Sequence, residues 1–117
     1  MSFQIMPLFE HFHETTFHIP SYKQVIAGNW NIADCVERAY DVEGMNVGTV
    51  AAGRIGLAVL RRMKPFDVKL HYYDFHRLPA DIEAELNATY HENVESLAAA
   101  CDVISIHCPL YRKFGNL

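Results

Sequence analysis

The segment from Thr49 to Gly56 constrains the fold of this chain more than any other part of its sequence. Residues 46–51 are typical of a strand, in which Val47 and Val50 flank Gly48 and Thr49. Residues 54–64 place apolar side chains at helical spacing, and Pro65 ends that run. A strand that turns through glycines directly into a helix is the opening of a βαβ unit.

The same alternation continues toward the C-terminus. Further strands are predicted at 68–73, 88–90 and 103–107, and further helices at 79–86 and 94–100. Asn93 is the predicted N-cap of the last helix, and Pro79 fits the first turn of the helix before it, which carries Asp81, Glu83 and Glu85 near its positive end. Strands alternating with helices favour a parallel sheet with right-handed crossovers. We therefore predict an α/β fold: a partial Rossmann-type parallel sheet of about four strands, in the order 3-2-1-4, with flanking helices.

Ala51, Gly53 and Gly56 occupy the three positions of a G-x-G-x-x-G fingerprint, with alanine in place of the first glycine. Gly53 would let the backbone approach a pyrophosphate, and Gly56 would let the helix pack closely on the strand. The start of the helix would offer free N–H groups to the phosphates. The methyl group of Ala51 makes the tight turn harder without blocking approach at Gly53. Taken alone, the two glycines are equally explained by packing.

Asp74 follows the next predicted strand, about 20 residues beyond Gly53, where dinucleotide-binding folds carry an acidic residue. Its carboxylate could accept hydrogen bonds from both hydroxyls of an adenosine ribose and would repel a 2′-phosphate. The alternative is a solvated turn residue ahead of Pro79. Because the strand, glycines, helix and acid are all in register, the sequence predicts binding of NAD rather than NADP.

Charge and composition argue against other classes of function. The 117 residues carry a formal net charge of −4 without a run of like charges, which disfavours nucleic acid as a partner. No stretch is apolar enough to span a membrane, and the three cysteines match no zinc pattern, so a reduced, cytoplasmic protein is expected. His11, His13 and His18 lack a carboxylate partner, and the other histidines are scattered; no metal site is predicted.

Several separate segments together resemble the NAD-dependent formate dehydrogenases of bacteria and plants, within the D-2-hydroxyacid dehydrogenase superfamily. They are residues 30–35, 40–45, 48–56, 65–68, 76–79 and 101–103. In that family Ala-x-Gly-x-x-Gly replaces the usual fingerprint, and the resemblance covers residues 22–110. Phe75 departs from it, because the family often has arginine after the ribose-binding acid.

The resemblance implies a set of cofactor-binding residues and no catalytic ones. Arg54 and Ile55 would lie against the pyrophosphate, Asp74 would hold the adenosine ribose, and Cys108 and Pro109 would line the adenine side. The full predicted set is Ala51, Ala52, Gly53, Arg54, Ile55, Gly56, Asp74, Cys108 and Pro109.

The same resemblance suggests how the chain is organised. We expect a poorly structured N-terminal segment at 1–20, where no clean period is found, and a helical lead-in at 21–44 that includes a short helix at 31–40. Residues 45–110 would form the first half of an NAD-binding domain. Residues 111–117 would be a C-terminal tail that departs from the family pattern.

The reaction implied for the full-length parent is the oxidation of formate by NAD⁺ to carbon dioxide and NADH. In the family, an arginine and a histidine paired with glutamine act downstream of the Cys108–Pro109 segment, so we expect a truncated or frameshifted gene product that is inactive alone. Formate would then bind only in the parent. The alternatives are a non-enzymatic nucleotide-binding module and a nonfunctional truncated product. Because family members dimerise largely through this region, a homodimer is also considered.

Overall fold

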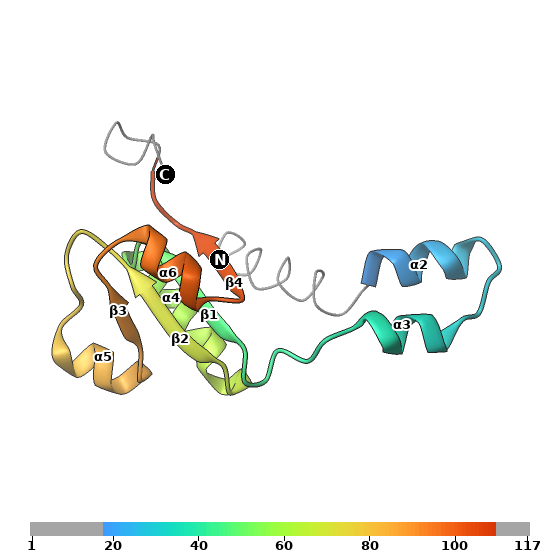
Figure 1. Cartoon of the computed structure of the whole chain (residues 1–117), viewed down its shortest axis with the longest axis horizontal. Helices are drawn as coiled ribbons and strands as arrows, with labels where there is room; N and C mark the ends of the chain where they lie inside the picture. Colours follow the sequence, from blue (N-terminus) through green and yellow to red (C-terminus); the bar gives the residue numbers. More distant parts are fainter. Residues whose placement is uncertain (1–17, 110–117) are drawn as a thin grey trace. The chain divides into compact units, whose positions relative to one another are not determined.

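The computed structural model describes residues 18–109, which belong to two units that meet between Val42 and Glu43 in the sequence. The described part of the first unit contains two helices, α2 (His18–Ile26) and α3 (Ile32–Arg38) (Figure 1). Gly28 ends the first with a left-handed φ of 83°, and its N–H donates to the carbonyl oxygen of Val25 at 3.0 Å. The amide of Gln24 donates to the carboxylate of Asp34 at 2.9 Å, which links the two helices.

The first unit agrees with the sequence only in part. The helix predicted at 31–40 is confirmed as α3, and the Asn31 side chain accepts the backbone N–H of Asp34 at 3.2 Å as an N-cap. However, α2 begins at His18, so the expectation of weak structure is wrong for residues 18–20. Residues 1–17 and the predicted tail at 111–117 lie outside the described residues.

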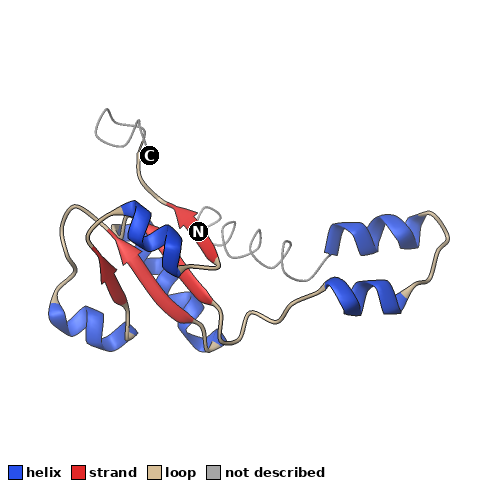
Figure 2. Ribbon diagram, viewed as in Figure 1, coloured by secondary structure: helices blue, strands red, loops and turns tan. Residues whose placement is uncertain are grey.

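The second unit is a four-stranded parallel sheet in the order β3-β2-β1-β4, which confirms the predicted α/β class and strand order. Its strands are β1 (Asn46–Val50), β2 (Lys69–Tyr73), β3 (Thr89–His91) and β4 (Val103–Ile106). Their arrows all point the same way (Figure 2). Val50 aligns with Tyr73 of β2 and Ile106 of β4, and Tyr73 aligns with His91 of β3. All four strands therefore end at one edge of the sheet, the carboxyl edge.

Helices connect the strands, and α4 and α6 lie on opposite faces of the sheet (Figure 1). The helical elements are α4 (Arg54–Met63), the 3₁₀ turn η1 (Lys64–Phe66), α5 (Ala80–Leu86) and α6 (Val94–Ala100). Asn93 caps α6 as predicted, accepting the N–H of Ser96 at 2.7 Å. Pro79 stands one position earlier than predicted, at the N-cap of α5, because its ψ of 145° is not helical.

The core of the second unit lies between the sheet and these helices. Leu60 and Met63 of α4, Tyr72 of β2 and Leu97 of α6 are all no more than 1% exposed. The helical spacing of apolar residues at 54–64 predicts a helix with one buried face, and α4 has such a face packed against the sheet. This packing fixes the start of α4 against the end of β1, where the predicted binding residues lie.

Candidate functional site

The turn between β1 and α4 lies at the carboxyl edge, held on both sides by neighbouring strands. The N–H of Ala51 donates to the carbonyl oxygen of Tyr73 at 2.7 Å, and the N–H of His107 donates to that of Val50 at 2.9 Å. Ala51 has a φ of 74°, in the left-handed region that favours glycine. The chain therefore turns at the place where the fingerprint usually has its first glycine.

Gly56 is required by the close approach of α4 to this turn. A Cβ atom at Gly56 would lie 2.1 Å from the carbonyl oxygen of Ala51, far inside van der Waals contact. His107 is the next neighbour, with its Cβ atom 3.7 Å from that position. The packing role that the sequence predicted for Gly56 is confirmed.

The space beside the Cα atom of Gly53 is open, whereas that beside Gly56 is filled. A Cβ atom at Gly53 would meet nothing within 4 Å, and Gly53 caps α4 without a side-chain hydrogen bond. The first bond into α4 is donated by the N–H of Leu57 to the carbonyl oxygen of Gly53 at 2.9 Å. The N–H groups of Arg54, Ile55 and Gly56 precede that bond and have no acceptor within the helix. An anion could reach them and the positive end of the helix dipole.

Asp74 lies against the turn rather than away from it. Its Oδ2 atom accepts the N–H of Ala52 at 2.7 Å, and its Oδ1 atom accepts the N–H of His76 at 3.2 Å. The side chain is half-buried. The structure thus brings together the glycine turn and the acid predicted after the second strand. Two backbone N–H groups fix the orientation of the Asp74 carboxylate toward that turn.

The remaining predicted residues occupy the same edge of the sheet. Arg54 is exposed at the first position of α4, and Ile55 beside it is 42% exposed. Cys108 and Pro109 follow β4 after His107, the first half-buried with a free thiol and the second exposed. Phe75 is 48% exposed and packs edge-on against Tyr73, with ring centroids 6.0 Å apart.

His107 is a feature of this edge that the scattered histidines of the sequence did not indicate. Its Nε2 atom is buried and has no hydrogen-bond partner among residues 18–109. Burial lowers the pKa of His107 from its ordinary value of 6.5. The ring is therefore neutral in the folded chain at neutral pH. The burial that causes this arises from the fold, in which His107 lies beside Gly56, and could not be predicted from the sequence.

The pH dependence of stability should follow from His107 and His71. Burial lowers the pKa of His71 as well, helped by repulsion from His91 and Lys69. Below pH 6.5 the unfolded chain takes up protons that the folded chain excludes, so the free energy of unfolding should fall as pH falls from 6.5 toward the lowered values. We expect a lower urea midpoint at about pH 5.5 than at about pH 7.5, and a smaller difference in His107→Gln. If His107→Gln shows the same difference in urea midpoint between the two pH values as the wild type, His107 does not contribute to the pH dependence of stability.

Ala51→Gly should stabilise the chain, because alanine is strained at a φ of 74°. We expect a gain of about 1 kcal/mol in the free energy of unfolding, measured by urea titration with an unchanged m-value. Ala52→Gly is the matched control: Ala52 is also buried but has no positive φ, so glycine there should destabilise by roughly 0.5–1 kcal/mol. A loss of stability in Ala51→Gly would contradict the strain argument.

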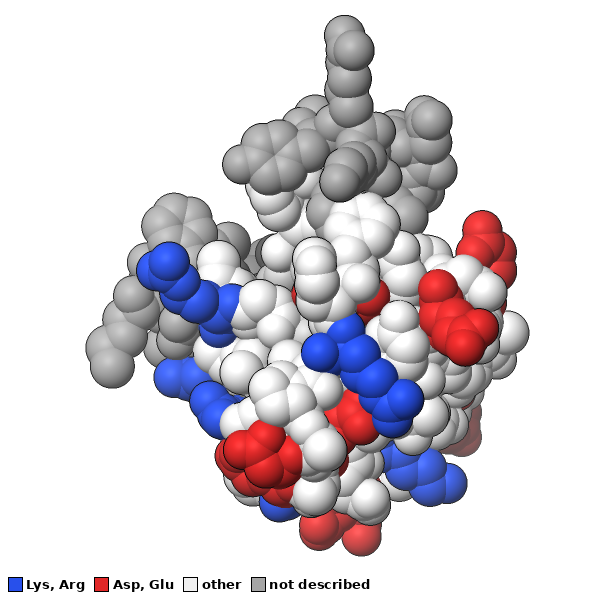
Figure 3. All heavy atoms as spheres, turned by 90° about the vertical axis from the view of Figure 1, so that its left-hand side faces the viewer, with Lys and Arg blue, Asp and Glu red and all other residues white. Residues whose placement is uncertain are grey.

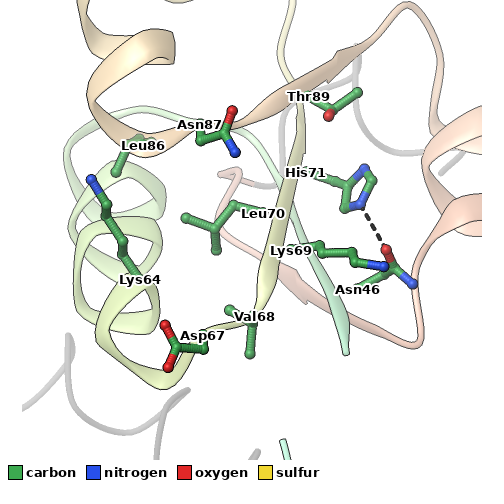
Figure 4. Close-up of a pocket in the computed structure, with 10 residues that line it drawn as sticks. All are labelled: Asn46, Lys64, Asp67, Val68, Lys69, Leu70, His71, Leu86, Asn87 and Thr89. Carbon is green, nitrogen blue, oxygen red and sulfur yellow. Dashed lines mark hydrogen bonds between the residues drawn. The ribbon is translucent and has the colours of Figure 1, made fainter. Parts of the chain in front are cut away.

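A separate groove of about 580 Å³ lies at the opposite edge of the sheet. It is lined by residues near the amino ends of β1, β2 and β3, among them Asn46, Lys69 and Thr89 (Figure 4). His71 also lines it, with Nε2 3.1 Å from the Oδ1 atom of Asn46. Open parallel sheets bind ligands at their carboxyl ends, so we assign the candidate site to the β1–α4 turn and not to this groove.

The described part of the chain holds neither a metal-binding cluster nor a membrane-spanning helix. Among residues 18–109, no group of three or more histidine, cysteine, aspartate or glutamate side chains is arranged to hold a metal ion. His11 and His13 lie outside those residues. None of the described helices has the length and apolar character needed to cross a membrane.

Comparison with known proteins relates the chain to one family. The family model described as "D-isomer specific 2-hydroxyacid dehydrogenase, NAD binding domain" matches residues 11–117. Formate dehydrogenase of Pseudomonas sp. (strain 101) is 60% identical over 100 residues, which cover 86% of this chain and 25% of that protein. The chain thus spans about a quarter of the length of such curated relatives.

Solved structures show the same similarity. A formate dehydrogenase of Granulicella M. matches with a TM-score of 0.92 and 58% identity, covering 95% of this chain and 30% of that one. An NAD-dependent formate dehydrogenase of Staphylococcus aureus, solved in complex with NAD, matches with a TM-score of 0.82 and 25% identity. The match covers 99% of this chain and 34% of that one.

Proposed function

This chain belongs to the family of D-isomer specific 2-hydroxyacid dehydrogenase NAD-binding domains, and from that premise we propose that its β1–α4 turn and Asp74 hold the adenosine diphosphate half of NAD. The observation that carries the proposal is the 2.7 Å hydrogen bond from the N–H of Ala52 to the carboxylate of Asp74. That bond joins the part of the site suited to phosphate to the part suited to ribose.

The geometry supports a distinct role for each group. The pyrophosphate would lie over Gly53, where the backbone is open, and accept the free N–H groups at the start of α4, with Arg54 and Ile55 beside it. Each oxygen of Asp74 accepts one backbone N–H and keeps a further acceptor site, so the two oxygens could receive the two hydroxyls of the ribose. We place Ala51, Gly56, Cys108 and Pro109 at the margins of this site, the last two on the adenine side.

We further infer that the parent protein is a formate dehydrogenase. The 60% identity to the Pseudomonas formate dehydrogenase supports this, whereas the chain spans only about a quarter of that protein. Bound NAD⁺ would accept a hydride from formate, which leaves as carbon dioxide. The catalytic arginine and histidine of the family are expected downstream of Pro109, so we propose that this chain alone has no turnover.

The proposal is tested by calorimetric titration of the chain with NADH and with NADPH, followed by an assay for formate-dependent NADH formation. We expect saturable binding of NADH, weaker binding of NADPH because Asp74 repels the 2′-phosphate, and no turnover. Failure to bind NADH would refute the proposed site and favour a nonfunctional product. Turnover with formate would refute only the proposed inactivity.

The assembly and location of the chain are proposals of the same kind. Residues of the first unit expose large apolar side chains, including Tyr22 at 60%, Ile26 at 66% and Trp30 at 78%. Contiguous exposed apolar patches mark sites of protein association, so apolar side chains exposed on one short segment support a homodimer. Sedimentation of the chain across a concentration series would detect it. The predicted cytoplasmic location stays a prediction.

A further inference from the structure

Residues 74–79 connect β2 to α5 and carry Asp74 at their first position. Contacts from three other side chains hold this connection, which would otherwise be a short exposed loop. They come from Tyr72 in β2, Glu83 in α5 and Tyr90 in β3. The loop that presents the candidate ribose-binding acid is thus tied to three elements of the sheet unit.

Tyr72 provides the buried end of this network. Its side chain is fully buried, and its hydroxyl accepts the N–H of Leu78 at 2.9 Å while it donates to the carboxylate of Glu83. Burial, together with the hydrogen bond to Glu83, raises the pKa of Tyr72 to about 12. The hydroxyl therefore stays protonated and can serve as donor and acceptor at the same time.

Glu83 is the centre of the network, since it receives donors from two sides. Its side chain is only 14% exposed, and Arg77 donates to both of its oxygens, from Nε at 2.8 Å and from Nη2 at 2.9 Å. Hydrogen bonds from Arg77, then from Tyr72, hold the pKa of Glu83 below its ordinary value. The ion pair is therefore a fixed, two-bond contact between the loop and α5.

The network closes on Asp74 itself. The guanidinium of Arg77 lies over the ring of Tyr90, 5.3 Å from its centroid, and the hydroxyl of Tyr90 approaches the carbonyl oxygen of Asp74 at 3.5 Å. On the side of the molecule that carries α5 and β3, acidic and basic side chains are interspersed (Figure 3). The ion pair between Arg77 and Glu83 joins the loop to α5 within this surface.

We propose that Glu83, acting through Tyr72 and Arg77, is a positioning residue that holds the 74–79 loop so that the Asp74 carboxylate faces the β1–α4 turn before any cofactor binds. This rests on the proposed function, in which Asp74 receives the ribose hydroxyls. A site whose loop is already ordered loses less entropy on binding, so disorder in the loop should weaken affinity. The competing explanation is that Glu83 only anchors α5.

The test compares Glu83→Gln with Glu85→Gln in the full chain. Glutamine at 83 keeps the size of the side chain but turns one acceptor oxygen into a donor, so Tyr72 or Arg77 loses its partner. Glu85 lies on the same helix and pairs with Arg61 at 3.1 Å, away from the loop, with both side chains nearly half exposed. It is therefore a matched control for loss of a charge from α5.

Two readouts separate positioning from simple anchoring. We expect the amide of Ala52, which donates to Asp74, to exchange with solvent about fivefold faster in Glu83→Gln, while the amide of buried Val59 is unchanged. We also expect the Kd for NADH to rise about fivefold. Glu85→Gln should stay within about twofold of the wild type in both measurements.

A double-mutant cycle with Asp74→Ala gives the sharpest discrimination. If Glu83 acts through Asp74, Glu83→Gln should not weaken NADH binding further in the Asp74→Ala background. If Glu83→Gln instead disturbs the fold in general, the losses of affinity from the two substitutions should add. Should Glu83→Gln fail to fold, Arg77→Gln changes the exposed end of the same pair and should give the same effects at about half the size. If the Ala52 amide exchanges at the wild-type rate in Glu83→Gln, the proposal is overturned even if NADH binds. If the wild-type chain does not bind NADH, the proposed function is refuted separately.

Discussion

Gly56→Ala is expected to destabilise the chain by about 3 kcal/mol or more, enough to leave much of it unfolded. The added methyl group would lie 2.1 Å from the carbonyl oxygen of Ala51, which is backbone and cannot rotate away. Either α4 moves off the sheet or the left-handed turn at Ala51 opens. Both changes would expose the buried face of α4, and urea unfolding followed by circular dichroism measures the loss.

Gly53→Ala is the matched control, since it adds the same methyl group three residues earlier in the same turn. Nothing lies within 4 Å of that methyl position, so the free energy of unfolding should change by less than about 1 kcal/mol. NADH binding should nevertheless weaken, because the methyl group would occupy the approach of the pyrophosphate. Equal stabilities for the two variants would show that α4 does not pack on the turn as described.

Asp74→Ala is expected to weaken NADH binding about 100-fold, the second large effect. The variant removes the acceptor for the ribose hydroxyls and also the partner of the Ala52 N–H, so the turn keeps its backbone bond to Tyr73 but loses its bond to the loop that follows β2. Because the charge that would repel a 2′-phosphate is also lost, the ratio of the Kd values for NADPH and NADH should fall. Calorimetry with each dinucleotide gives both numbers.

Asp81→Ala provides the control for the change in net charge. Asp81 is exposed in the first turn of α5 and lies outside the proposed site, so NADH affinity should stay within about twofold of the wild type. Equal weakening by both variants would show that Asp74 acts through long-range charge and not through contact with the cofactor.

The parts of the fold that could be predicted are those that depend on local spacing. The helical period of residues 54–64 depends only on which face of α4 is buried, and the strand order follows from right-handed crossovers between parallel strands. The packing role of Gly56 could be predicted because the steric demand of the turn is the same wherever a strand passes directly into a helix. The position of Asp74 beside the turn could be predicted for a different reason, because the ends of two neighbouring parallel strands meet at the same edge of the sheet.

The network around Asp74 could not be predicted, because it depends on contacts between separate elements. Glu83 is one of two acids in the first turn of α5, and the third acid predicted near that end, Glu85, lies in the last turn instead. In the sequence, helix dipole effects are sufficient to explain Glu83. Only the fold shows that it accepts hydrogen bonds from Tyr72 and Arg77. The buried Nε2 of His107 is a similar case, since four scattered histidines carry no pattern that separates one from the others.

Binding of ADP-ribose, followed by amide chemical shifts, tests the central claim most directly, because this ligand carries the diphosphate and the adenosine ribose without the nicotinamide. We predict saturable shifts at residues 52–56 and at Asp74, and their loss in Asp74→Ala. Shifts confined to the groove around Lys69 and His71, or none at any ligand concentration, would contradict the assignment of the dinucleotide site to the β1–α4 turn.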